Sequence, residues 1–383
     1  MANFKILHIF GPDTKNSYGI LKQLHMNFDN SKHKYLITSY KNATERFPKL
    51  KEFDDLYFIP HTGGKIKRIF YFYKLLSNHD LIVWHSLYFT TFKYMLFIYA
   101  FKKFLKKSVW IEWGADLYLW KYKNHTIKGK LKNYLCKKIR ESFNYVGCSF
   151  PVDEIEAKKQ FGDNIKCFYT PLPNPKERPT ELIELIEKSR PCDLKKQNLI
   201  VQIGHNSFTF NNHFKLINSL KKFNDESIRF IIPLTYGIYG INGQYGGIAY
   251  KKRVINYAKK NLKNVFIMEQ NMPFENYLKL LWAIDVAVFD FDRPCGLGTL
   301  RILMLMGKKI FLPANTPYFE FLRSNGLAVY DTNLIPEMSF EEFTRMPEYT
   351  NKEWIYDYLN NDKIIEKWKF MFDELEKELG VKK

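Results

Sequence analysis

Short runs of apolar residues recur along the whole chain, and stretches with apolar positions at helical spacing separate them. The runs are apolar on both faces, which is typical of buried strands in parallel sheets built from βαβ units. In the first half they predict strands at residues 5–10, 35–38, 56–59, 81–84, 108–112, 145–148 and 166–169. In the second half they predict strands at residues 199–203, 229–234, 265–268, 285–291 and 309–312.

A proline-rich stretch at 171–198 interrupts this series, and a fresh series of strands begins at Leu199. We therefore predict an α/β protein with two Rossmann-like, doubly wound domains facing a cleft, the N-terminal one over 1–180 and the C-terminal one over 195–350. Helical spacing predicts one or two helices over 352–379 with a stop at Gly380. Whether residues 352–383 pack back on the N-terminal domain stays open.

Composition supports two packed domains. The chain has 383 residues, of which 46% are hydrophobic and 17% aromatic, and this excludes a disordered protein. Its five cysteines are odd in number and have no ligand-like spacing, which excludes a disulfide framework or structural zinc site and predicts a reducing cytosol. The first apolar run ends at Gly11-Pro12 without a cleavage site, so it predicts a strand rather than a signal peptide.

The positive charge is concentrated in residues 61–140. This region has seventeen Lys or Arg residues against three Asp or Glu residues, a balance of +14 out of the chain's +19. Aromatic residues lie among these cations, as in basic helices that rest on anionic membranes. Solvated lysine-rich helix faces are the alternative. No nucleic-acid-binding signature is present, so we predict no nucleic-acid partner.

No segment is predicted to cross a membrane. The longest membrane-like stretch, 88–101, is interrupted by Lys93, and a spanning helix needs about 20 apolar residues. We therefore expect a cytoplasmic protein that lies on the inner face of the cell membrane.

The segment 285–306 contains the strongest candidate for a phosphate site. It predicts a buried strand, a loop with Gly296 and Gly298, and a helix that begins near Thr299. Glycines allow a ligand to approach the backbone, and the amino end of a helix attracts phosphate. Arg293 or Arg301 would add a charged contact to a diphosphate. The alternative is that the glycines serve only the turn.

Two more loops are candidates. The loop Gly204-His205-Asn206-Ser207 follows a predicted strand, although Asn206 and Ser207 would also suit a helix cap. The Gly- and Tyr-rich stretch 233–247, which includes Tyr236, predicts either a loop that closes over a ligand or a solvated connection. Asp290 and Asp292 form an acidic pair, but we expect no metal there.

In the first half, the run 109–118 predicts a strand that ends at Glu112-Trp113, a turn at Gly114 and Asp116 in the loop. A carboxylate beside aromatic rings is poorly hydrated and therefore more basic, which suits a general base. Helix capping is the alternative role for Asp116. His8 and His85, at or near strand ends, are further candidates for the cleft, and a structural role is the alternative for each.

Together these residues resemble a known family. Trp113-Gly-Ala-Asp-Leu-Tyr118, Ile203-Gly-His-Asn-Ser207 and Gly296-Leu-Gly-Thr-Leu300 followed by Gly307-Lys-Lys-Ile310 resemble the bacterial 4-acetamido-4,6-dideoxygalactose (Fuc4NAc) transferases, glycosyltransferase family 56. The order and spacing of these motifs match those of the family over roughly residues 1–325, including His8, Gly11 and the segment 271–277. The Gly- and Tyr-rich stretch is longer here than in the family.

The resemblance implies a GT-B enzyme without metal or cofactor. It would transfer a deoxy-amino sugar such as Fuc4NAc from a TDP-type nucleotide sugar to a lipid-linked oligosaccharide in bacterial surface-glycan synthesis. Asp116 would be the catalytic base, with Glu112 and His85 in reserve. The implied donor-binding residues are Gly204, His205, Asn206, Tyr236, Met272, Phe274, Arg293, Gly296, Gly298 and Thr299. The implied acceptor-binding residues are His8, Gly11, Trp113 and Gly114.

Two alternatives stay open. One is a GT-B transferase with another donor or acceptor. The other is a non-catalytic, membrane-docked module that binds a glycan or a nucleotide.

Overall fold

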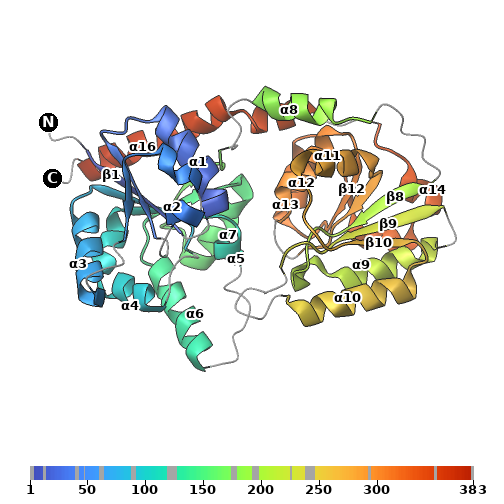
Figure 1. The fold of residues 1–383 in the computed structure, drawn as a ribbon, viewed down its shortest axis with the longest axis horizontal. Coiled ribbons are helices and arrows are strands. Elements are labelled where there is room, and N and C mark those ends of the chain that lie inside the picture. The colour runs from blue at the N-terminus through green and yellow to red at the C-terminus, as the bar shows by residue number, and fades with distance from the viewer. Residues whose placement is uncertain are drawn as a thin grey trace. The chain divides into compact units, whose positions relative to one another are not determined.

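The structure, a computed structural model, describes residues 4–11, 14–38, 43–46, 48–59, 64–87, 92–118, 127–173, 179–191, 198–224, 227–237, 246–291, 295–348 and 352–380. The chain divides into two compact units (Figure 1). Unit 1 consists of Met1–Pro179 and Leu359–Lys383, and unit 2 consists of Thr180–Tyr358.

Unit 1 is built on a parallel sheet with the strand order β3-β2-β1-β4-β5-β6-β7. Its strands are β1 (Ile6–Phe10), β2 (His33–Ile37), β3 (Leu56–Phe58), β4 (Leu81–His85), β5 (Ser108–Ile111), β6 (Tyr145–Cys148) and β7 (Lys166–Tyr169). Its helices are α1 (Thr14–Asn27), α2 (Ala43–Arg46), η1 (Pro48–Glu52), α3 (Gly64–Ser77), α4 (Phe92–Ala100), η2 (Lys102–Lys107), α5 (Ala115–Tyr118), α6 (Ile127–Arg140), α7 (Pro151–Phe161) and α16 (Asn361–Gly380).

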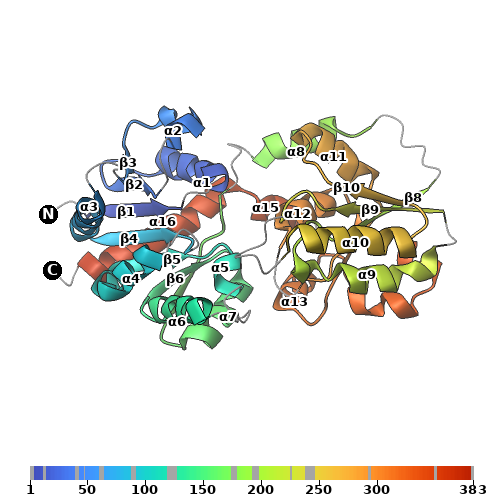
Figure 2. The ribbon, with the colours of Figure 1, turned by 60° about the horizontal axis from the view of Figure 1, so that its bottom comes forward.

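Both faces of this sheet are covered. Side chains alternate along each strand, so Leu7 and Ile9 face one layer while Ile6 and Phe10 face the other. Helices α3, α4, α6 and α7 pack on the first face, and α1 and α16 pack on the second. Figure 2 shows α16 beside β4 and β5, so the C-terminal end of the chain completes the core of unit 1.

Unit 2 is built on a second parallel sheet with the order β10-β9-β8-β11-β12-β13. Its strands are β8 (Leu199–Ile203), β9 (Ile228–Pro233), β10 (Val265–Met268), β11 (Val286–Val288), β12 (Lys309–Leu312) and β13 (Val329–Asp331). Its helices are α8 (Pro179–Lys188), η4 (Thr209–Asn211), α9 (His213–Leu220), η5 (Lys221–Phe223), α10 (Ile248–Asn261), α11 (Phe274–Ala283), α12 (Leu297–Leu305), α13 (Pro317–Ser324), η6 (Thr332–Glu337), α14 (Phe340–Thr344) and α15 (Lys352–Tyr358). Helices α9 and α10 pack on one face of this sheet (Figure 1).

The predicted fold class, α/β with two doubly wound parallel sheets, is confirmed, and each predicted strand occurs. Strand β11 is shorter than predicted, and α12 begins two residues before Thr299 because Gly296 already caps it. Strand β13 was not predicted. It has three residues and ends in Asp331, so it lacks the apolar run that identified the others.

Candidate functional site

The carboxyl ends of β8 and β11 form the switch point of the sheet in unit 2. Strands β9 and β10 lie beyond β8, and β12 and β13 lie beyond β11, so the chain leaves these two neighbours in opposite directions. In open parallel sheets a crevice forms at such a point, and ligands bind there. Gly204 follows β8 directly, and the loop after β11 leads into α12.

These two loops lie against each other. Gly296 has a φ of 67°, and a Cβ there would lie 2.8 Å from the His205 ring. Both the backbone conformation and the close approach therefore require glycine. Because Gly296 is the N-cap of α12, the amino end of that helix begins beside His205. The structure thus brings the two predicted donor loops together.

The first turn of α12 is open. A Cβ at Gly298 would meet no atom within 4 Å. Thr299 shares a 2.6 Å hydrogen bond with the hydroxyl of Tyr277, which α11 contributes. The first N–H groups of a helix have no partners within it and carry the positive end of its dipole. This turn can therefore bind a phosphate or diphosphate.

Asn206 organises the loop after β8. Its Oδ1 accepts hydrogen bonds from Phe208 N (2.9 Å) and Asn211 Nδ2 (2.7 Å). Its Nδ2 lies 2.7 Å from His205 Nε2. Since the amide can only donate there, the neutral imidazole of His205 carries its proton on Nδ1. The loop is thus held by its own side chains, and it presents the His205 ring to Gly296.

The other predicted donor residues are only partly brought to this point. The ring of Tyr236 lies edge-on to His205, with centroids 6.2 Å apart. Met272 and Phe274 follow β10, on the far side of β9 from β8, and none of their described contacts joins them to His205. Arg293 lies outside the described residues.

The Gly- and Tyr-rich stretch is anchored beside the same loop. A Cβ at Gly246 would lie 2.6 Å from Gly237 O and 2.9 Å from Ser207 O. Gly247 N also donates a hydrogen bond to Gly237 O (3.2 Å). The two described ends of the stretch therefore meet at Ser207. Residues 238–245 lie outside the described part of the chain.

Two ion pairs at this edge were not predicted. Lys251 Nζ, in the first turn of α10, lies 3.1 Å from Glu269, which follows β10. Lys215 Nζ lies 2.7 Å from the buried carboxylate of Asp290, so an ammonium group already neutralises this acid. No signal in the sequence identifies these pairs, because each joins residues far apart in the chain. Asp292 lies outside the described residues.

In unit 1, Asp116 is enclosed by N–H donors. Its Oδ2 accepts hydrogen bonds from Leu87 N (2.9 Å) and Trp110 Nε1 (2.7 Å), and its Oδ1 accepts one from Trp113 N (2.8 Å). The residue is 2% exposed. Asp116 therefore ties the loop after β4 to the loop after β5. This geometry favours the alternative structural role, and the role as general base stays a prediction.

Glu112 belongs to a second buried cluster. It accepts hydrogen bonds from Gly114 N and Ser149 N (2.7 Å) and is hydrogen-bonded to Asp153. Burial, followed by the charges of Asp153 and Asp116, raises the pKa of Glu112 well above its usual range. Burial also raises the pKa of Asp153 to about 6, and Asp153 accepts a 2.7 Å hydrogen bond from the Tyr118 hydroxyl. Such a pair retains a proton near neutral pH.

His8 and His85 lie inside the core. His8 Nδ1 lies 3.0 Å from His85 Nε2, and His8 Nε2 lies 2.9 Å from His33 Nδ1. His8 and His85 are fully buried beneath α16, where Phe372 packs edge-on to His8 and Trp368 stacks on His85. Their proposed roles with an acceptor or in catalysis stay predictions that this placement does not favour.

The remaining predicted acceptor residues follow the ends of β1 and β5. Gly11 directly follows β1, and Trp113 and Gly114 form the turn after β5. The sheet of unit 1 has its switch point between β1 and β4, where Ser86 has a φ of 65°. A positive φ is uncommon for a residue other than glycine and occurs frequently at functional sites. Ser86 was not predicted.

Comparison with known families identifies the chain. The sequence profile described as "4-alpha-L-fucosyltransferase glycosyl transferase group 56" matches residues 20–369. The chain belongs to glycosyltransferase family 56. The resemblance seen in the sequence motifs is thereby confirmed, and the family 56 protein is a glycosyltransferase.

Solved structures similar to this family 56 protein have the GT-B fold. Anabaena Alr3699/HepE, in complex with UDP and glucose, is 10% identical with a TM-score of 0.63, and the match covers 97% of this chain and 100% of that chain. A glycosyltransferase from Rickettsia africae is 13% identical with a TM-score of 0.60, and the match covers 98% and 99%. At these identities the likeness shows the fold alone.

The basic, aromatic region of the family 56 protein carries exposed apolar side chains. On α3, Ile66 and Phe70 are one helical turn apart, and on α6, Ile127 and Leu131 have the same spacing. All four are exposed, up to 88% for Ile127, and lysines surround them in the sequence. No described helix combines the length and the apolar composition that crossing a bilayer requires.

Proposed function

We propose that this family 56 enzyme transfers a deoxy-amino sugar such as Fuc4NAc from a TDP-type nucleotide sugar to a lipid-linked oligosaccharide in bacterial surface-glycan synthesis. The observation that carries the proposal is the family match over residues 20–369, combined with two predicted donor loops that meet at a switch point. UDP-bound Anabaena Alr3699/HepE, which has the same fold, supports a nucleotide-sugar donor. The identity of the donor sugar is inferred from the resemblance of the sequence motifs to the family.

Unit 2 would bind the donor. Its diphosphate would lie on the N–H groups of the first turn of α12, near Gly298 and Thr299, with His205 at the side. As the bond between the sugar and the diphosphate breaks, negative charge builds up on the departing nucleotide. Aligned N–H donors stabilise that charge in the transition state without reorganising.

Unit 1 would bind the acceptor, through the turn at Trp113 and Gly114 and through Gly11. The acceptor hydroxyl would attack the sugar carbon and give its proton to Asp116, with Glu112 and His85 as reserves. Because Asp116 is buried, this step requires the segment 113–117 to open when the acceptor binds. A lipid-linked acceptor also accounts for exposed apolar residues in a basic region, which would rest on the anionic inner face of the cell membrane.

The test is a transfer assay with the full chain. TDP-, UDP- and GDP-sugars are each incubated with an undecaprenyl-diphosphate oligosaccharide, and released nucleotide and extended product are measured. We expect release that depends on the acceptor, with TDP-Fuc4NAc preferred. Preference for another donor would identify a different GT-B transferase. Binding of a nucleotide sugar without any transfer would favour the non-catalytic module.

A substitution tests whether the donor binds at α12. Gly298→Val adds a side chain where no protein atom lies within 4 Å, so it should leave the fold intact and obstruct a diphosphate on α12. Losing one or two hydrogen bonds to a charged group, at about 1.5–3 kcal/mol each, weakens donor binding at least tenfold. Gly380→Val is the matched control, because Gly380 is the last residue of α16, also borders open space and lies in unit 1.

A further inference from the structure

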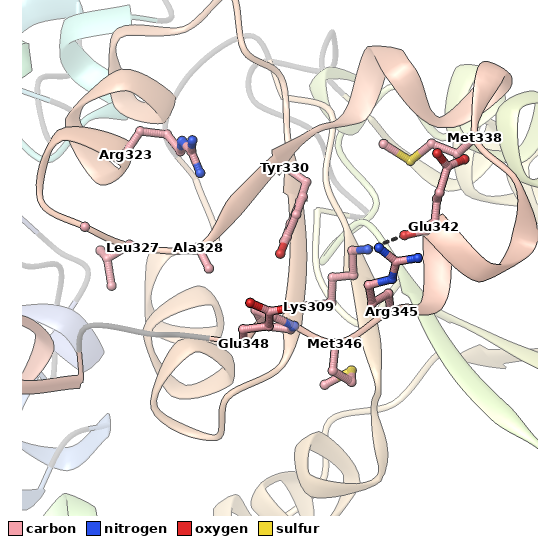
Figure 3. Close-up of a pocket in the computed structure, with 12 residues that line it drawn as sticks. Lys309, Arg323, Leu327, Ala328, Tyr330, Met338, Glu342, Arg345, Met346 and Glu348 are labelled. Atoms are coloured by element: carbon pink, nitrogen blue, oxygen red, sulfur yellow. Dashed lines mark hydrogen bonds between the residues drawn. The ribbon is translucent and has the colours of Figure 1, made fainter.

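A cavity lies at the edge of the sheet in unit 2 that is formed by the amino ends of its strands. It occupies about 610 Å³ at the amino ends of β12 and β13 (Figure 3). The proposed donor site lies at the carboxyl ends of β8 and β11. Strand β12, the segment from α13 to β13 and the segment that follows η6 contribute its walls. This volume is within the range of about 300–1,000 Å³ that is usual for small-molecule sites.

A buried lysine lies in the wall of this cavity. Lys309 is 2% exposed, and its Nζ donates a hydrogen bond to the backbone carbonyl of Glu342. The ammonium also lies 4.5 Å from the centroid of the Tyr330 ring. Among the described residues, no carboxylate forms an ion pair with it. A buried ammonium without a carboxylate is costly, and it has N–H donors left to offer a ligand.

The Glu342 carboxylate, at the same cavity, is already engaged. Glu342 accepts hydrogen bonds from Ser339 N (2.7 Å) and Ser339 Oγ (2.9 Å), which cap α14. Hydrogen bonds from Ser339 also lower the pKa of Glu342. The Glu342 side chain therefore serves the helix start, and only its backbone carbonyl contacts Lys309.

Two further cations line the same cavity. Figure 3 shows the Arg345 guanidinium close to the Lys309 ammonium, with Arg323 extending from α13 on the other side. Burial, followed by the charge of Arg345, lowers the pKa of Lys309 to about 8. Within the described residues, Arg345 forms its ion pair with the exposed Glu341, and such surface pairs contribute little. The Arg323 side chain has no hydrogen-bond or ion-pair partner in the described part of the chain.

We propose that this cavity binds the phosphate or carboxylate group of a small molecule, held by Lys309, Arg323 and Arg345. Guanidinium and ammonium groups bind oxyanions through charge-assisted hydrogen bonds, and a bound anion would neutralise the neighbouring cations of Lys309 and Arg345. The apolar wall, which includes Leu327 and Met346, would contact the body of the ligand, and Glu348 could accept a hydrogen bond from a hydroxyl. This site is independent of the proposed transfer reaction.

The test is a calorimetric titration of the full chain with inorganic phosphate, glycerol 3-phosphate and succinate, each up to the millimolar range. We expect at least one probe to bind, and the double variant Arg323→Gln/Arg345→Gln to weaken that binding at least tenfold. Both arginines are exposed, so the variant should fold, and its unfolding midpoint checks this. Lys309→Met is the second variant. Comparing the phosphates with succinate distinguishes the two oxyanion sources.

Two variants serve as controls. Arg229→Gln removes one arginine charge from an exposed position on β9, and Gly298→Val alters the proposed donor site. Arg229→Gln should bind the probe as the unmodified chain does, whereas Gly298→Val should retain the binding that depends on Arg323 and Arg345. The proposal is overturned if no probe binds, if the double variant binds with unchanged affinity, or if Gly298→Val abolishes the binding instead. The last outcome would place the anion on α12.

Discussion

Gly296 and Gly298 are two residues apart in the chain, yet their surroundings are opposite. Gly296 has a positive φ and faces the His205 ring, so its missing side chain is a requirement of the fold. Gly298 lies in the first turn of α12 beside open space, so nothing in the described structure requires glycine there. A functional reason for Gly298, close approach by a ligand, is consistent with this difference.

Alanine substitutions separate the two roles. Gly296→Ala should lower the free energy of unfolding by about 1–3 kcal/mol, because it combines an unfavourable φ with a contact at 2.8 Å. Gly298→Ala should leave stability unchanged or raise it by up to about 1 kcal/mol, because alanine favours a helix. Denaturant unfolding measures both. A loss of stability in Gly298→Ala equal to that in Gly296→Ala would contradict this interpretation.

Asp116 poses a different question, because three N–H groups already bind its carboxylate. Asp116→Asn turns an amide nitrogen toward one of these donors, which should cost about 1–3 kcal/mol of stability. If Asp116 is also the general base, kcat should fall by about 10²–10⁴ in the same variant.

Trp110→Phe is the matched control for Asp116→Asn, since it removes one donor to the same carboxylate and leaves the carboxylate in place. It should lower stability by about 1 kcal/mol and keep kcat within a few fold. Transfer rates measured well below the unfolding temperature decide between the roles. If both variants keep full activity, Asp116 acts only in the structure.

At the scale of elements, α16 completes unit 1 by covering a row of histidines. His33, His8 and His85 belong to β2, β1 and β4, which are adjacent strands. Burial lowers the pKa of His33 to about 4 and that of His85 to about 3, and burial with the neighbouring histidines lowers the pKa of His8. The rings are therefore neutral in the folded protein at neutral pH.

This arrangement predicts acid sensitivity. Histidine in the unfolded chain has a pKa of about 6.5, so these folded-state values are depressed. The stability that the neutral histidines contribute is fully present above pH 6.5. It is lost as the pH falls toward 4, because the unfolded chain binds protons that the folded chain excludes. For His33 alone the loss is about 3 kcal/mol over that window. Urea unfolding at a series of pH values measures it.

Two variants isolate the imidazoles from the packing. His85→Phe keeps a ring stacked between Phe10 and Trp368 but removes a titrating group, so stability should depend less steeply on pH between 6.5 and 4. Phe372→Leu weakens packing on His8 and should lower stability equally across that range. An unchanged pH slope in His85→Phe would show that this histidine does not contribute.

The same histidines show how much of the fold and of the candidate site could be predicted from the sequence. Apolar runs identified the strands because burial on both faces leaves a local pattern, and the motifs at Gly204 and Gly296 identified loops that do meet. The packing that covers His8 could not be predicted from the sequence, because Phe372 lies on a helix at the far end of the chain. The buried state of Lys309 depends on residues from three separate segments in the same way. Local patterns predict elements, whereas enclosure depends on long-range packing.

For the whole molecule, +14 of the net charge of +19 and the exposed apolar side chains of α3 and α6 occur in the same region of the sequence, residues 61–140. Charge attracts a protein to anionic lipid over a Debye length of about 10 Å, and apolar side chains then hold it by burial. The lysine-rich faces alone would give only the electrostatic attraction. The exposed side chains of Phe70 and Leu131 add the apolar burial.

Cosedimentation with vesicles separates these effects and tests the membrane contact. The chain should bind vesicles that contain phosphatidylglycerol, bind neutral phosphatidylcholine far less, and lose affinity as salt is added. Phe70→Ser/Leu131→Ser keeps every charge, yet it should weaken binding at least tenfold, because burying each side chain contributes about 1.5–3 kcal/mol. Phe370→Ser, at an exposed position of α16, is the control and should bind normally. Equal binding by all three proteins would mean that only the solvated lysine faces act, and the apolar residues would then need another explanation.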